Sequence, residues 1–247
     1  FIILLLIMIP LATTELGTDS WITDLMAPAM SELGMQAGWV LVYTSAIMFV
    51  LRFFAGPLVH KFSPLGLLAI CSVIAALGLY LLSASAGVMI LIAATIYGLG
   101  KTFFWPTMLG VVAERFPKGG ALTLNITGGM GMIAAGVIGA GVLGFIQDKS
   151  VDAKIAEYDK TNSTALHSTY VTENKTSLFG GYQALNQEKL ATANTEEQAT
   201  VANIQNNAKK GALRDIVIFP LIMFVSYVLL ILYFRNKGGY KAVVLKQ

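Results

Sequence analysis

Long apolar runs alternate with short polar joints along most of the chain. The runs are rich in Leu, Ile, Val, Ala, Phe and Gly, and turn-forming sequences such as SASAG and RFPKGG interrupt them. A helix needs about 20 mostly apolar residues to cross a bilayer. Runs that reach or approach this length are residues 1–27, 36–57, 64–84, 88–113, 120–146 and 216–234. The pattern therefore predicts an all-α integral membrane protein with six transmembrane helices.

A polar insert separates the fifth apolar run from the sixth. Its stretch YQALNQEKLATANTEEQATVANIQNNAKK, which begins at Tyr182, has good helix formers and no proline, so we expect a surface helix or helical hairpin there. The predicted organisation is five helices over 1–147, a polar, partly helical outer loop over 148–215, a sixth helix over 216–234 and a basic tail over 235–247.

The composition supports a membrane environment and argues against several other classes of protein. Only 13% of the residues are charged and 55% are hydrophobic, whereas soluble domains carry about 25% charged residues. The mean hydropathy is +0.68. The sequence has no HExxH, no G-x-S-x-G and no phosphate-binding P-loop. We therefore expect no metal site, no cofactor, no nucleic-acid partner and no enzymatic activity.

The distribution of lysine and arginine predicts the orientation, because short cytoplasmic joints carry an excess of both. The short joints that follow the first and third runs contain neither residue. The basic residues of the other joints and the tail are Arg52, Lys61, Arg115, Lys118, Arg235, Lys237, Lys241 and Lys246. This predicts a multi-pass protein of a plasma or inner membrane, with a cytoplasmic C-terminus and the insert on the outer side.

Lys101 is a charged residue near the centre of the fourth apolar run. A charge at that depth faces the protein interior or a water-filled cavity, and it needs partners. On an uninterrupted helix Tyr97, Lys101 and Trp105 share one side, although Pro106 weakens the helix just beyond them. Two interpretations are open: a polar pocket in which Lys101 binds an anionic or hydroxylated solute, and a structural ion pair that fixes helix register.

Glu15 and Asp19 are the natural counter-charges of Lys101, because a spacing of four residues puts both on one helix face. Two carboxylates in a low-dielectric cavity repel each other, so either is a candidate proton-coupling site. The alternative is that both lie in water at the outer interface. Pro10 and Gly17 predict a bend in this first helix.

Two further polar side chains are candidates for contact with a solute. Tyr43, in the second run, could stack on a sugar-like ring or belong to the aromatic belt at the membrane interface. Asn125 opens the fifth run, which is dense in glycine. Glycine-rich helices pack closely against neighbours, and this one is also suited to bending.

The joint RFFAGPLVHKFSPLGLL, between the second and third runs, resembles the cytoplasmic signature loop of major facilitator superfamily (MFS) transporters. That loop reads roughly Gly-x-Leu-x-Asp-(Arg/Lys)-x-Gly-Arg-(Arg/Lys), and Gly56, Leu58 and Lys61 match it. His60, Ser63 and Pro64 replace an acid, a glycine and an arginine of the pattern. Such erosion is similar to the copy in the C-terminal half of these proteins, and ERFPKGGA resembles their related cytoplasmic joint.

The resemblance implies helices seven to twelve of a twelve-helix fold, so we expect the sequence to be the second part of a longer chain whose N-terminal six-helix half is its partner. It also implies a cavity lined by the first, second, fourth and fifth spans, toward which Glu15, Tyr43, Lys101, Trp105 and Asn125 would point. The implied function is secondary active transport of a small polar organic solute, such as a sugar, nucleoside or carboxylate, by alternating access in a lipid bilayer. The alternative function is a six-helix scaffold or receptor-like protein whose outer loop 148–215 binds a partner.

Overall fold

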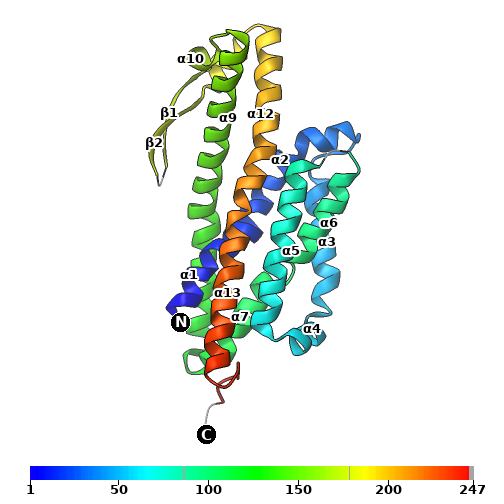
Figure 1. Ribbon diagram of the computed structural model, residues 1–247, viewed down its shortest axis with the longest axis vertical. Helices are drawn as coiled ribbons and strands as arrows, with labels where there is room; N and C mark the ends of the chain where they lie inside the picture. Colours follow the sequence, from blue (N-terminus) through cyan, green and yellow to red (C-terminus); the bar gives the residue numbers. More distant parts are fainter. Residues whose placement is uncertain (86, 178, 245–247) are drawn as a thin grey trace.

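Helices form most of the chain in the computed structural model, which describes residues 1–85, 87–177 and 179–244 (Figure 1). The first apolar run contains α1 (Ile2–Ala12), the π-helical turn η1 (Thr13–Gly17) and α2 (Thr18–Glu32). The second forms α3 (Trp39–Arg52), which the short helix α4 (Ala55–Phe62) follows. The next elements in order are α5 (Pro64–Ala84), α6 (Met89–Lys101), α7 (Phe104–Arg115), η2 (Pro117–Gly119), α8 (Gly120–Ile133), the π-helical η3 (Ala134–Gly139), α9 (Ala140–Asn162) and, after the insert, α13 (Ile218–Asn236).

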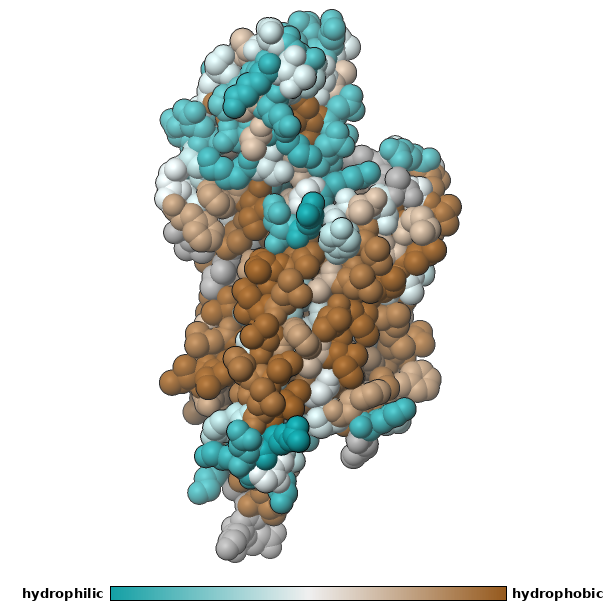
Figure 2. Space-filling view, in the orientation of Figure 1, coloured by the Kyte–Doolittle hydropathy of each residue, from teal (hydrophilic) through white to brown (hydrophobic). Residues whose placement is uncertain are grey.

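On the face shown in Figure 2, a band of hydrophobic surface crosses the helix bundle, with hydrophilic surface above and below it. Within the described residues, four helical segments, counted across short irregular turns, are long and apolar enough to cross a membrane: Pro64–Ala84, Met89–Arg115, Pro117–Asn162 and Thr195–Asn236. Ile2–Gly17 and Trp39–Arg52 are shorter apolar helices. The mainly helical fold agrees with the sequence pattern. Of the other two expected spans, the first is apolar only to Gly17 although its helix continues through α2 to Glu32, and the second has the 14 residues of α3.

The first and fourth spans each contain irregular backbone close to a proline. Pro106 has no amide hydrogen to donate to the carbonyl of Thr102, so the helix is interrupted between α6 and α7. In the first span, η1 lies between Pro10 and Gly17, where a bend was predicted, and Thr14 Oγ1 donates a 2.7 Å hydrogen bond to the Pro10 carbonyl. The span therefore changes register within the segment that carries Glu15 and just before Asp19.

Helices α5 and α6 pack against each other through glycine. A Cβ added to Gly100 would lie 2.3 Å from the backbone nitrogen of Ala75, and one added to Gly78 would lie 2.4 Å from that of Tyr97. Both distances are shorter than any contact that a real side chain makes. The close approach of the two backbones therefore requires glycine at both positions, and it sets the position of Lys101 at the end of α6.

We predict that Gly100→Ala separates α5 from α6 and lowers the free energy of unfolding by about 3 kcal/mol, because the added methyl meets backbone atoms. Thermal unfolding of the detergent-purified protein measures the effect. Gly110→Ala is the matched control, since a Cβ there has no neighbour within 4 Å. Equal melting temperatures for the two variants would contradict this account of the α5–α6 contact.

The insert contains a helical pair and a β-hairpin. Helices α9 and α12 (Thr195–Ile216) rise side by side beyond the hydrophobic band (Figure 1). The part between them contains α10 (Leu166–Tyr170), the antiparallel strands β1 (Val171–Ser177) and β2 (Gly180–Leu185), and α11 (Gln187–Ala191). The expected helix is thus wrong at its start, since Tyr182 lies in a strand, and the predicted limit at 147 falls inside α9.

A separate hydrophobic cluster holds the insert together. Its buried members include Ile155 of α9, Tyr170 of α10 and Val201 of α12. The hairpin is attached to α9 through Asp148, which accepts hydrogen bonds from Tyr182 Oη at 2.9 Å and Lys175 Nζ at 3.2 Å. Burial, together with the hydrogen bond to Asp148, raises the pKa of Tyr182 to about 12.

The C-terminal tail folds back onto the end of α7. Gly238 and Gly239 have positive φ angles of 88° and 94°, which allow the reversal. Glu114 accepts hydrogen bonds from Tyr240 Oη at 2.7 Å and, at its carbonyl, from the Val243 amide at 2.8 Å. The basic tail is therefore attached to the joint between the fourth and fifth spans, and its Lys246 lies outside the described residues.

Candidate functional site

Lys101 and Asp19 form an ion pair in the interior of the bundle. Their side chains are 0% and 17% exposed. Lys101 Nζ also donates to Thr44 Oγ1 at 3.4 Å and lies 5.0 Å from the centre of the Tyr97 ring. The ammonium group thus has a carboxylate, a hydroxyl and an aromatic face as partners, which together replace its hydration.

A second ion pair lies one helical turn away. Arg52 Nη2 is 3.2 Å from Glu15 Oε1, and the two side chains are 44% and 3% exposed. Arg52 Nε donates a 3.2 Å hydrogen bond to the carbonyl of Thr102. That carbonyl is available because Pro106 cannot donate to it. The break in the fourth span therefore helps to orient the arginine that neutralises Glu15.

Tyr97 joins the first span to the fourth at this level. Its hydroxyl donates a 2.6 Å hydrogen bond to the carbonyl of Thr14, which lies within η1. A π-helical turn displaces the backbone relative to a regular helix, and such turns occur often at functional sites. The bond holds η1 against α6 and so places Asp19 and Glu15 relative to Lys101.

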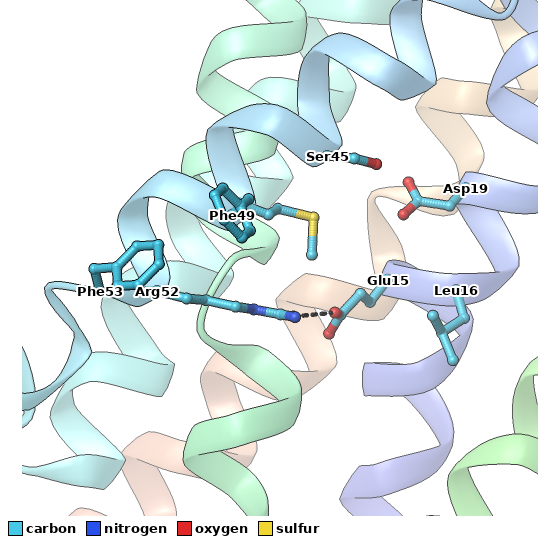
Figure 3. A pocket seen from close by; sticks show the side chains of 8 residues that line it. Glu15, Leu16, Asp19, Ser45, Phe49, Arg52 and Phe53 are labelled. Carbon is cyan, nitrogen blue, oxygen red and sulfur yellow. Dashed lines mark hydrogen bonds and ion pairs between the residues drawn. The ribbon is translucent and has the colours of Figure 1, made fainter.

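An open cavity of about 470 Å³ lies beside the two ion pairs. Figure 3 shows Arg52 reaching from α3 toward Glu15, with Asp19 and Ser45 farther along the same hollow. The remaining lining residues are Leu16, Met48, Phe49 and Phe53. Two carboxylates, one guanidinium and two aromatic rings therefore face a single space, which suits a small solute with both polar and apolar surfaces.

The structure brings Tyr97 to Lys101, whereas Trp105 approaches the site with its backbone, which lies against the Glu15 carboxylate, and not with its ring. The Trp105 ring lies beside Gly131 of α8, where an added Cβ would be 2.6 Å from it, and the same point is 2.6 Å from Met8 of α1. The predicted common face of Tyr97, Lys101 and Trp105 is wrong because the helix is interrupted after Lys101. Trp105 packs against α1 and α8 instead of completing the polar stripe.

None of the residues predicted to bind a solute is among those that line the cavity: Lys101, Tyr97, Trp105, Tyr43 and Asn125. Lys101 and Tyr97 are fully buried, and Lys101 lies behind Asp19, its ion-pair partner in the cavity wall. Tyr43 Oη makes a 2.7 Å hydrogen bond with Thr95 Oγ1, and its ring faces a separate apolar groove of about 360 Å³ with Ile47 and Leu99. Asn125 is exposed on α8. Neither residue gathers with Lys101 in this structure, so the predicted set of solute-binding residues is only partly assembled.

The residues of the signature pattern lie in α4, at the end of the bundle opposite the insert (Figure 1). Leu58 packs against the core, and Lys61 Nζ lies 5.5 Å from the centre of the Phe62 ring. Ser63 then caps α5: its Oγ accepts a 3.3 Å hydrogen bond from the Gly66 amide. Ser63, one of the residues that depart from the pattern, therefore ends α4 and starts α5.

Residues 7–149 match the family model of the Major Facilitator Superfamily. The chain belongs to the major facilitator superfamily. No curated protein and no solved structure matched the chain in the same comparisons. Membership in this family implies a transporter, in agreement with the apolar helices of a multi-pass integral membrane protein.

Members of the superfamily are generally not enzymes. In the described part of this MFS chain, no three His, Cys, Asp or Glu side chains gather to hold a metal ion.

Arg52 is the residue of this MFS cavity that sequence reasoning missed. Its position at the end of an apolar run indicated only a basic inner joint. Two signals could have identified it: the unpaired Glu15 in the first span, and Pro106, which leaves the carbonyl of Thr102 without its helical donor. Both partners of Arg52 are far from it in sequence, so the two contacts depend on the packing of α3 against the first span and against α6.

We predict that the pair Lys101–Asp19 is strongly coupled. Asp19→Leu or Lys101→Met alone leaves a buried charge without its partner and should lower the free energy of unfolding by about 3–5 kcal/mol, whereas the double variant should recover most of that loss. Unfolding of the detergent-purified protein gives the four values of the cycle. The exposed pair Lys149–Asp152 provides the control: Lys149→Met should cost at most about 0.5 kcal/mol. If the double variant lost the sum of the two single losses in free energy of unfolding, the coupling between Asp19 and Lys101 would be contradicted.

Proposed function

We propose that the chain is the C-terminal six-helix half of a secondary transporter that moves a small polar organic solute by alternating access. The observation that carries this proposal is the open cavity beside two internal ion pairs, Lys101–Asp19 and Arg52–Glu15. Internal charges in membrane helices mark solute or ion pathways by default. In transporters of this architecture, the solute binds where the two halves meet and the halves rock around it.

The open side of the cavity supports a role for a second six-helix half. The hollow is not enclosed by the described residues, and the outer face of α3 exposes Phe49 and Phe53, which line it. The eroded signature loop at Gly56, Leu58 and Lys61 favours the C-terminal copy. An N-terminal half placed across the cavity would close it and would remove the remaining water from Arg52.

The two ion pairs provide a means of coupling solute binding to a change of state. A solute with a carboxylate or several hydroxyls would compete with Asp19 for Lys101 or with Glu15 for Arg52. The displaced carboxylate then needs a new partner, and a proton supplies one. Glu15 and Asp19 are therefore our candidate proton-coupling residues, and Lys101, with Tyr97 beside it, is the central solute-binding group.

We predict that Lys101→Met lowers the initial uptake rate at least about tenfold, because a charge-assisted contact to the solute is lost. The assay uses the full-length protein in proteoliposomes with an imposed pH gradient and a panel of radiolabelled sugars, nucleosides and carboxylates. The control is Lys149→Met, which removes the same charge from the insert. Glu15→Gln and Asp19→Asn extend the test, since loss of a coupling carboxylate should flatten the dependence of uptake on pH. An unchanged uptake rate and an unchanged pH dependence of uptake in Lys101→Met would contradict the assignment of Lys101 as a solute-binding group.

A second candidate function is a scaffold or receptor-like role for the insert. One specific observation favours it: the insert has a hydrophobic cluster of its own, built from α9, α10, the hairpin and α12. A polar loop that only connects two spans does not need such a core. In this alternative, residues 148–215 bind a partner and the ion pairs only maintain helix register.

Replacing residues 163–194 with a short Gly/Ser linker separates the two functions, because it removes α10, the hairpin and α11 but leaves α9 and α12 joined. We predict that uptake by this variant stays within about twofold of the intact protein, since no residue of the cavity is touched. Uptake is measured as above, after thermal unfolding has shown that the bundle is folded. The receptor-like alternative would be favoured by two results together: the folded linker variant has lost all uptake, and the Lys101→Met variant keeps it.

A further inference from the structure

A second cavity, of about 420 Å³, lies where the insert meets the bundle. Tyr80, Ser83 and Ala84 line it from the last turn of α5, and Lys154 lines it from α9. The side formed by α12 consists of Asn207, Lys210, Gly211 and Arg214. It shares no residue with the cavity beside Lys101, and the proposed transport mechanism makes no use of it.

Three cationic side chains face this cavity. Lys210 and Arg214 are four residues apart, on one face of α12, and Gly211 beside them contributes no side chain to fill the space. Lys154 Nζ donates a 2.7 Å hydrogen bond to the carbonyl of Asn207, which fixes it at the rim. Within residues 1–85, 87–177 and 179–244, none of these three forms an ion pair. The cavity therefore has a concentration of positive charge that is not neutralised by those residues.

The cavity lies at the boundary between apolar and polar surface. Figure 2 shows hydrophilic residues directly above the hydrophobic band, at the level where α5 ends and α12 continues upward in Figure 1. Tyr80 is half-exposed near the end of α5, a position that aromatic residues favour at the membrane interface. The three cations are thus at the depth of lipid headgroups.

An apolar stripe leads from this cavity along α5. Ile70, Val73, Leu77 and Tyr80 are all between 41% and 50% exposed. Their spacing of three or four residues puts them in one row along the helix. A ligand that fills the cavity with an anionic group would therefore find an extended apolar surface directly below. A free anion would bury no apolar area on such a surface, whereas an acyl chain would.

We propose that this cavity binds the phosphate of an anionic phospholipid in the leaflet that faces the insert, with an acyl chain along the stripe Ile70–Val73–Leu77. Lys154, Lys210 and Arg214 neutralise the phosphate, and Tyr80 belongs to the same lining. Because α5 belongs to the bundle and α9 and α12 continue into the insert, the bound lipid joins the two parts at their boundary.

The test measures lipid binding to the full-length protein by native mass spectrometry, with phosphatidylglycerol, phosphatidylcholine and inorganic phosphate as separate probes. Removal of each cation should weaken phosphatidylglycerol binding about fivefold, so Lys210→Gln/Arg214→Gln should weaken it about 25-fold. The control is Lys160→Gln/Lys189→Gln, which removes two exposed cations of the insert outside the cavity. It should stay within about twofold of the unmodified protein.

Each other outcome contradicts the proposal. Equal losses in the two double variants would mean that diffuse surface charge attracts the lipid. Phosphatidylcholine bound as tightly as phosphatidylglycerol would mean that the cations do not select an anion. Displacement of phosphatidylglycerol by millimolar inorganic phosphate would identify a free anion as the ligand. Finally, we expect Val73→Ser/Leu77→Ser to weaken binding of the lipid but not of inorganic phosphate. An unchanged lipid affinity in this variant would mean that no acyl chain lies along the stripe.

Discussion

A lysine ammonium that is completely removed from solvent has to be neutralised inside the protein, and the arrangement around Lys101 follows from that constraint. Asp19 provides the opposite charge, Thr44 an acceptor and Tyr97 an aromatic face. These partners come from different spans, so the charge can be accommodated only if the first, second and fourth spans meet at one point. The buried ion pair thereby constrains the mutual positions of three helices.

Irregular backbone makes this meeting possible. The π-helical turn η1 shifts the first span so that its two carboxylates reach different cations, and the interruption before α7 leaves the Thr102 carbonyl for Arg52. Glycine at positions 78 and 100 then lets α5 and α6 approach closely enough to hold Lys101 in place. Regular helices with larger residues at these points would keep the same charges apart.

The helical membrane fold could be predicted from the sequence because hydrophobicity over about 20 residues is a strong local signal. The need of Lys101 for an acidic partner was equally predictable, since an internal charge cannot remain unpaired. The division of Glu15 and Asp19 between two cations was not, because it depends on a π-helical turn whose register a regular helix pattern does not represent. The predicted position of Trp105 on the face of Lys101 was wrong for a related reason, because it assumed a continuous helix across the residues before Pro106. The hairpin was missed because Tyr182–Leu185 is followed at once by strong helix formers, which dominated the pattern.

The helix α12 continues directly into α13, so the insert is attached to the membrane bundle as a stiff extension. With 22 residues, α12 is about 33 Å long at the rise of an α-helix. A tilt of α13 by about ten degrees would therefore displace the far end of α12 by about 6 Å. Helix α12 is in this sense a lever arm, which converts small angular changes within the lipid into large linear displacements in the surrounding water.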